Sequence, residues 1–146
     1  MIKELLRNLF IDAVLKADID FLRKIVLFKG LSERSLAKIA LIVFKKTYLA
    51  GEKIYEPNQD ANVVYIVKSG QVKLNSENIN KIVDSGDFFG EISLIENHRH
   101  SCETIALKDS ELYLIYRAKF EDIAESDNKA GLIIMKNLAS IFTNRA

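Results

Sequence analysis

Apolar residues recur at two different spacings along the chain, and the change of spacing divides it into three segments. In residues 1–44 they return every three or four positions, which is typical of amphipathic helices. In residues 45–117 they form short runs separated by turn residues, which is typical of strands. The helical spacing returns in residues 118–146. We expect one single domain with a β-rich segment between two helical segments.

A first helix is predicted over residues 1–16, with a wide apolar stripe. Asp18 is placed to cap a second helix, and Ser32, after Gly30, to cap a third over residues 33–43. The stripe consists of Ile2, Leu5, Leu6, Leu9, Phe10, Ala13 and Val14. We expect this stripe to pack on its own domain; the alternative is that it pairs with a second chain.

The middle segment predicts about eight strands at close, regular spacing, which favours a small antiparallel barrel or sandwich. Ser69-Gly70 is interpreted as a two-residue hairpin turn that pairs strand 63–68 with strand 71–74. The other strands are expected at residues 45–49, 52–55, 79–83, 88–89, 103–107 and 111–116. A short helix over 118–124, a cap at 126–128 and a last helix over 132–142 follow.

Composition and charge exclude several classes of protein. The chain is 49% hydrophobic with a formal net charge of +1, which argues against disorder and against nucleic-acid binding by charge alone. Residues 47–125 hold eight Lys/Arg against fourteen Asp/Glu, so a phosphate ligand there needs a basic side chain beside it. The single cysteine excludes an intramolecular disulfide, and no stretch has the length of a bilayer span. We expect a soluble, cytoplasmic protein.

Residues 86–106 carry the strongest sign of function. Gly86 permits a tight turn, residues 88–89 form a short apolar strand, and Glu91 begins a one-turn helix after Gly90. Free amides at a glycine and at a helix start, with a carboxylate and an arginine nearby, suit a small anion that carries hydroxyls.

The run Phe89-Gly90-Glu91-Ile92-Ser93-Leu94-Ile95 resembles the phosphate-binding cassette of the cyclic-nucleotide-binding domain family, which includes the cyclic-AMP receptor regulators and the regulatory subunits of cyclic-AMP-dependent kinase. Residues 22–32 and 65–72 resemble the helical lead-in and the central hairpin of that family, and the resemblance extends over residues 20–142. It implies an α+β fold: an eight-stranded antiparallel β-roll, jelly-roll-like, over residues 45–117, with helices on both sides of it in sequence.

The resemblance also implies a role for each cassette residue. Gly90 and Glu91 hold the ribose hydroxyl of cyclic AMP or cyclic GMP in the family, and an arginine nine or ten residues later holds the cyclic phosphate. Here His100 stands nine residues after Glu91, and Arg99 stands one residue earlier. The implied ligand-binding residues are Phe89, Gly90, Glu91, Ile92, Ser93, Arg99, His100, Ser101 and Cys102.

Structural roles are the alternatives for these residues. Glu91 can cap or salt-bridge its own helix, and Arg99 can lie solvated on a hairpin tip. His100 can replace the arginine as a weaker phosphate ligand that depends on its own protonation. Ser101 and Cys102 can be small packing residues.

The sequence favours neither a metal site nor an enzyme active site. His98, His100 and Glu103 faintly resemble a metal-binding strand of the cupins, which are also β-rolls. Strand alternation places Glu103 on the face opposite the two histidines, and the chain has no third histidine. The sequence has no Ser/His/Asp set, P-loop or paired-carboxylate cleft. We expect no metal and no enzymatic activity.

We therefore expect a regulatory sensor domain in which a bound cyclic nucleotide moves the last helix. Its signal would pass to a partner protein or a second copy through the terminal helices. The last helix carries an apolar stripe at Ile134, Met135, Leu138, Ile141 and Phe142. We expect no direct DNA binding, because no helix-turn-helix sequence is present. The alternative is a β-roll that has lost its ligand and serves as an interaction or dimerisation module.

Overall fold

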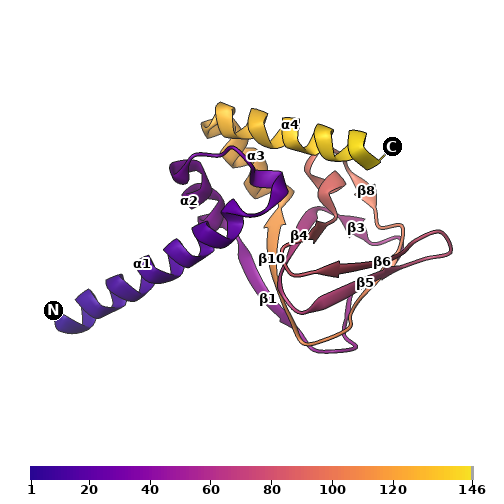
Figure 1. Ribbon diagram of the computed structural model, residues 1–146, viewed down its shortest axis with the longest axis horizontal. Helices are drawn as coiled ribbons and strands as arrows, with labels where there is room; N and C mark the ends of the chain where they lie inside the picture. The colour runs from indigo at the N-terminus through magenta and orange to yellow at the C-terminus, as the bar shows by residue number, and fades with distance from the viewer. Residues whose placement is uncertain (146) are drawn as a thin grey trace. The chain divides into compact units, whose positions relative to one another are not determined.

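A computed structural model describes residues 1–145, which form ten strands, four α-helices and two 3₁₀ helices (Figure 1). These residues group into two units. The helical unit consists of Met1–Ile42 and the chain from Asp122 onward, and the β unit consists of Val43–Glu121. No helix of the described residues is long and apolar enough to cross a membrane.

The β unit contains two four-stranded antiparallel sheets, with the strand orders β1-β10-β4-β7 and β2-β9-β5-β6, and a separate pair, β3 with β8. The strands are β1 (Phe44–Tyr48), β2 (Lys53–Tyr55), β3 (Asp60–Ala61), β4 (Val63–Ser69), β5 (Gln71–Asn75), β6 (Asn80–Asp84), β7 (Phe88–Phe89), β8 (His98–Arg99), β9 (Glu103–Ala106) and β10 (Ser110–Tyr116). Side chains from both sheets form one apolar core, which includes Val67, Val72, Val83 and Leu112.

The antiparallel roll expected from the sequence is confirmed, and it holds two strands more than expected. These are β3 and β8, which lie outside the eight stretches where strands were expected. Asp60 pairs with Arg99 and Ala61 with His98. Two residues on each side are too few to give an alternating pattern, so the sequence offers no strand signal there.

The hairpin predicted at Ser69-Gly70 is wrong. β4 pairs with β10 and β7, whereas β5 pairs with β6 and β9, so the two strands lie in different sheets. Gly70 has φ 96°, and a Cβ atom there would lie 2.7 Å from the carbonyl oxygen of Asp109. Gly70 therefore turns the chain from one sheet into the other at a point where it touches the start of β10.

The helical unit begins with one helix, α1 (Ile2–Arg23), where two were expected. Asp18 is buried inside this helix and does not cap a new one. The physical reason is that residues 1–29 contain neither glycine nor proline to interrupt it. The 3₁₀ helix η1 (Val26–Phe28) follows.

The predicted helix caps after this point are confirmed. Ser32 precedes α2 (Glu33–Ile42), and its hydroxyl accepts a hydrogen bond from the Ser35 amide at 3.1 Å. Asp127 lies between α3 (Arg117–Ser126) and α4 (Asn128–Arg145), and its carboxylate accepts a bond from the Ala130 amide at 3.2 Å.

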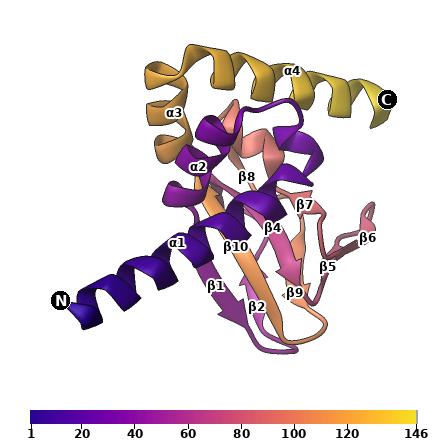
Figure 2. The same cartoon turned by 60° about the vertical axis from the view of Figure 1, so that its left-hand side comes forward.

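The apolar stripe on the first half of α1 is exposed, so the expectation that it packs on its own domain is wrong for this stretch. Figures 1 and 2 show this half of the helix extending past α2. Every large apolar side chain of residues 1–11 is more than half exposed: Met1, Ile2, Leu5, Leu6, Leu9, Phe10 and Ile11. The buried residues of α1 lie further along, and include Ile19 and Leu22.

Candidate functional site

The cassette begins at two glycines with left-handed backbone conformations. Gly86 has φ 91° and Gly90 has φ 78°. A Cβ atom on Gly90 would lie 2.9 Å from the carbonyl oxygen of Val63, so glycine allows the chain to pass this close to β4. Gly90 also precedes the 3₁₀ helix η2 (Glu91–Leu94). The turn and the one-turn helix expected from the sequence are therefore both present.

The helix η2 carries two buried polar side chains. Glu91 is 6% exposed, and Ser93 is fully buried. The Ser93 hydroxyl has no hydrogen-bond partner among the described residues. Most buried hydroxyls in proteins have a hydrogen-bond partner. The Ser93 hydroxyl is therefore an unusual free polar group inside the cassette. Ile92, between them, is partly buried.

Arg99 lies on the outside of the β unit. Its side chain is 69% exposed, and one guanidinium nitrogen donates a hydrogen bond to the Asn58 carbonyl oxygen at 3.2 Å. Its Nε lies 3.9 Å from a carboxylate oxygen of Asp60, the residue opposite it in the β3–β8 pair. The guanidinium thus contacts neighbouring surface groups and is otherwise exposed.

His100, the next residue, is buried at 7% exposure. Its ring stacks on that of Tyr55, with centroids 3.4 Å apart and planes 9° apart. Its amide donates to the Gln59 carbonyl oxygen, and its own carbonyl oxygen accepts from the Asn58 amide, both at 2.9 Å. These contacts hold the imidazole inside.

The buried position of His100 determines its charge. Desolvation, with a smaller contribution from nearby His98, lowers the pKa of His100 from 6.5 to about 4. The ring is therefore neutral at pH 7. It can exchange hydrogen bonds with a ligand, but it offers no positive charge to a phosphate.

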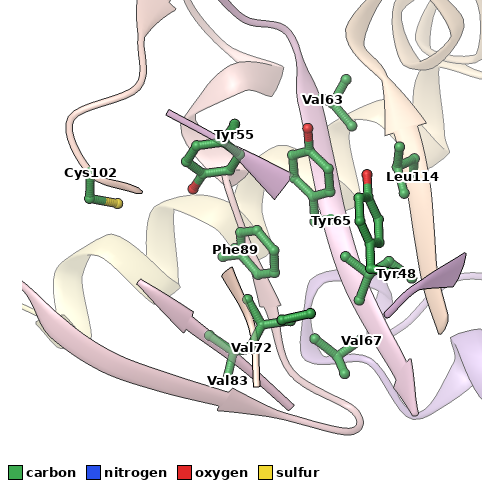
Figure 3. Packing of buried hydrophobic residues seen from close by; sticks show 12 residues of the cluster. Tyr48, Tyr55, Val63, Tyr65, Val67, Val72, Val83, Phe89, Cys102 and Leu114 are labelled. Atoms are coloured by element: carbon green, nitrogen blue, oxygen red, sulfur yellow. The ribbon is translucent and has the colours of Figure 1, made fainter. Parts of the chain in front are cut away.

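Aromatic rings occupy the interior of the roll (Figure 3), and one of them, Tyr55, stacks on His100. Tyr65 and Phe89 stack with centroids 5.0 Å apart, and Tyr55 lies 5.7 Å from Tyr65 and 6.2 Å from Phe89. Burial raises the pKa of both tyrosines above their ordinary value. Phe89, predicted as a ligand residue, is thus part of a packed aromatic cluster.

Ser101 and Cys102, the two small residues after His100, differ in exposure. Ser101 is exposed, whereas Cys102 is buried, with its sulfur 4.0 Å from the Thr104 hydroxyl. Cys102 belongs to the same apolar core as Tyr55 and Phe89. Cys102 therefore has the surroundings of a small packing residue, which was the alternative role given to it from the sequence.

Arg117, at the start of α3, is a residue that the sequence reasoning missed. Its guanidinium donates to the carbonyl oxygens of Ser93 at 3.3 Å and Glu96 at 2.9 Å, and to the side-chain oxygen of Asn97. It thus braces the end of the cassette helix. A basic residue at a helix start is unfavourable for the helix dipole, and this mismatch was a signal that the side chain has partners elsewhere.

The two histidines lie near each other without forming a metal site. Their ring centroids are 6.1 Å apart, and the His98 Nδ1 atom has no hydrogen-bond partner in the part of the chain that is described. Over residues 1–145, no group of three or more His, Cys, Asp or Glu side chains is arranged to hold a metal ion.

Comparisons with known proteins give the family. The family described as "Cyclic nucleotide-binding domain" matches residues 45–127. The chain is 31% identical over 80 residues to a cAMP-dependent protein kinase regulatory subunit of Candida albicans, covering 53% of this chain and 17% of that protein. It is 29% identical over 126 residues to the Cyclic AMP receptor protein of Thermus thermophilus, covering 82% and 56%.

A solved structure shares the fold. The N-terminal domain of a transcriptional regulator from Streptomyces coelicolor superposes with a TM-score of 0.76 at 18% identity, covering 86% of this chain and 92% of that one. The chain belongs to the cyclic nucleotide-binding domain family, a class of regulatory domains, as the resemblance in the cassette predicted.

Proposed function

We propose that this chain is a regulatory domain that acts through protein contacts, and that its cassette binds cyclic AMP and cyclic GMP weakly or not at all. The observation that supports this most is the neutral, buried His100 at the spacing where the family has an arginine. Arg99, the other basic candidate, already contacts Asn58 and Asp60 on the surface. A cyclic phosphate at this bend would lack the charge-assisted hydrogen bonds that make arginine an effective phosphate ligand.

Calorimetric titration with cyclic AMP and cyclic GMP at pH 7 tests the proposal. We expect no heat of binding for either nucleotide at submillimolar concentration. His100→Arg places a permanent charge at the missing position, and we expect it to gain measurable binding, whereas Arg99→Gln leaves the titration unchanged. A dissociation constant in the micromolar range for the wild type would contradict the proposal.

A nucleotide sensor is the second candidate, and the cassette's first half favours it. Gly90 keeps its left-handed turn, and the Ser93 hydroxyl has no hydrogen-bond partner in the described part of the chain, so a polar group for a ribose remains. In this case His100 binds the phosphate, and the helix from Leu132 moves when the ligand is bound. Binding would then strengthen as the pH falls from 7 to 5, because the bound anion raises the pKa of His100. His100→Ala abolishes this pH dependence, whereas Arg99→Ala retains it.

We assign the contact surface to the exposed half of α1 and the partner to a second copy of the chain. Its large apolar side chains are more than half exposed within the described residues, and contiguous exposed apolar surface of this kind marks interaction sites. Residues 1–13 carry Lys3 and Arg7 against Glu4 and Asp12, so two copies of this half helix meet without net repulsion. The free thiol of Cys102 is consistent with a cytoplasmic location.

A further inference from the structure

The helical unit contains a cavity of about 430 Å³ with a basic wall. It lies where the starts of α2 and α4 meet. Three basic side chains line it, together with three hydroxyl residues and one carboxylate: Arg34, Lys38, Lys129, Ser32, Ser35, Ser126 and Asp127. A volume of this size suits a small molecule, and the excess of positive charge suits an anion.

Asp127 is fully engaged within the protein. One carboxylate oxygen accepts bonds from the Ser35 hydroxyl at 2.8 Å and from Lys38 Nζ at 3.2 Å, and the other accepts from the Ala130 amide. The Ser35 bond, followed by the Ala130 bond, lowers the pKa of Asp127, so this group stays charged. It neutralises Lys38 and no other cation of the cavity.

Arg34 and Lys129 are the two cations that remain. Neither forms an ion pair with a carboxylate of residues 1–145. They come from different helices, α2 and α4, and line the same cavity. Both side chains are exposed, so an anion in the cavity can be approached by two positive charges that have no carboxylate partner among residues 1–145.

The backbone supplies further donors at the same place. Ser32 and Asp127 cap the third amides of α2 and α4, and the first two amides of each helix have no intrahelical acceptor. The positive ends of both helix dipoles add to the charge of Arg34 and Lys129.

We propose that this cavity binds the phosphate group of a small phosphorylated molecule, with Arg34 and Lys129 as its charged ligands. The site is independent of the cassette, because no residue that lines it belongs to residues 86–106. It is also independent of the proposed function, since it requires no cyclic nucleotide. Phenyl phosphate, a simple monoester, and inorganic phosphate are the probes that match this chemistry.

Thermal unfolding and calorimetry on the full chain, at constant ionic strength, test the site. We expect phosphate and phenyl phosphate to raise the unfolding midpoint relative to chloride, because they bind the folded state. The double variant Arg34→Gln/Lys129→Gln should bind each probe at least about tenfold more weakly. Its matched control, Arg7→Gln/Lys24→Gln, removes two exposed charges outside the cavity and should bind as the wild type does.

A third variant is expected to bind phosphate more tightly instead of more weakly. Asp127→Asn retains a side chain that caps α4 well but removes the one negative charge in the lining, so it should bind phosphate more tightly than the wild type. The proposal is overturned by an equal response of wild type and double variant, by no response beyond that to chloride, or by a weaker response in Asp127→Asn.

Discussion

Arg99 and His100 are neighbours in sequence, yet the Arg99 side chain is 69% exposed and His100 is 7% exposed. His100 directly follows the strand β8 (His98–Arg99), and successive side chains of an extended chain point to opposite sides, so only one of the two faces the interior. The sequence alone does not show which of the two side chains is buried. The choice between them follows from pairing with Asp60 and from the stack on Tyr55, both of which lie far away along the chain.

Lowering the pH is expected to destabilise the fold through His100. The pKa is about 6.5 in the unfolded chain and about 4 in the folded one, so the unfolded state binds more protons between these values. The free energy of unfolding is highest above pH 6.5 and falls as the pH is lowered to 4, by roughly 3 kcal/mol. Urea unfolding at a series of pH values measures this loss.

His100→Phe is the control for this titration, because phenylalanine retains a ring against Tyr55 and cannot take up a proton. Carboxylates also titrate near pH 4, so the informative quantity is the difference between the two stability curves. If the unfolding free energies of wild type and His100→Phe change in parallel between pH 6.5 and 4, groups other than His100 cause the pH dependence.

Two glycines with similar positive φ angles are expected to differ in their tolerance of alanine. Gly86 and Gly70 have φ 91° and 96°, which costs alanine about 1 kcal/mol at either position. A Cβ atom meets nothing within 4 Å at Gly86, whereas at Gly70 it meets the backbone of Asp109 and Ser110. We expect Gly70→Ala to lose about 2 kcal/mol more than Gly86→Ala in chemical denaturation. Equal losses would show that the corner between the sheets is free to shift.

At the scale of elements, Arg117 stabilises the end of the short helix η2 through hydrogen bonds from the start of α3. Arg117→Gln removes the three bonds to Ser93, Glu96 and Asn97, and we expect a loss of about 2 kcal/mol in unfolding free energy. Amide hydrogen exchange of residues 91–98 should become faster, since the end of the cassette helix is released. Lys119→Gln, an exposed change on the same helix, should alter neither measurement.

The type of each helix or strand was predictable where the periodic pattern is long, but the pairing of the strands in the sheets was not. The caps at Ser32 and Asp127 and the strands on either side of Gly70 were identified from local residues. Their arrangement was not, because β4 and β5 follow each other with one residue between and still enter different sheets. Pairing depends on which distant strand offers a free edge, and this information is spread over the whole chain.

At the scale of the whole molecule, the exposed stripe of α1 predicts self-association. We expect light scattering to show a mass that rises from monomer to dimer with concentration. Leu6→Glu places a charge in the stripe and should shift the equilibrium to the monomer, because a buried unpaired charge is costly.

Asn8→Glu is the matched control, since it adds the same charge outside the apolar stripe and should leave the dimer intact. A wild type that stays monomeric at every concentration, or an equal effect of both variants, would remove the stripe as the contact surface.

The sequence by itself determined the alternation of helical and β segments, the antiparallel roll and the family, because these follow from periodicity and from a contiguous motif around Gly90 and Glu91. The tertiary structure alone decided that His100 is buried and neutral, that Arg99 is solvated, and that Arg34 and Lys129 share a cavity. Charge and exposure depend on neighbours brought from remote parts of the chain. A local pattern can name the residues of a site, but only folding sets the dielectric and the partners that decide their chemistry.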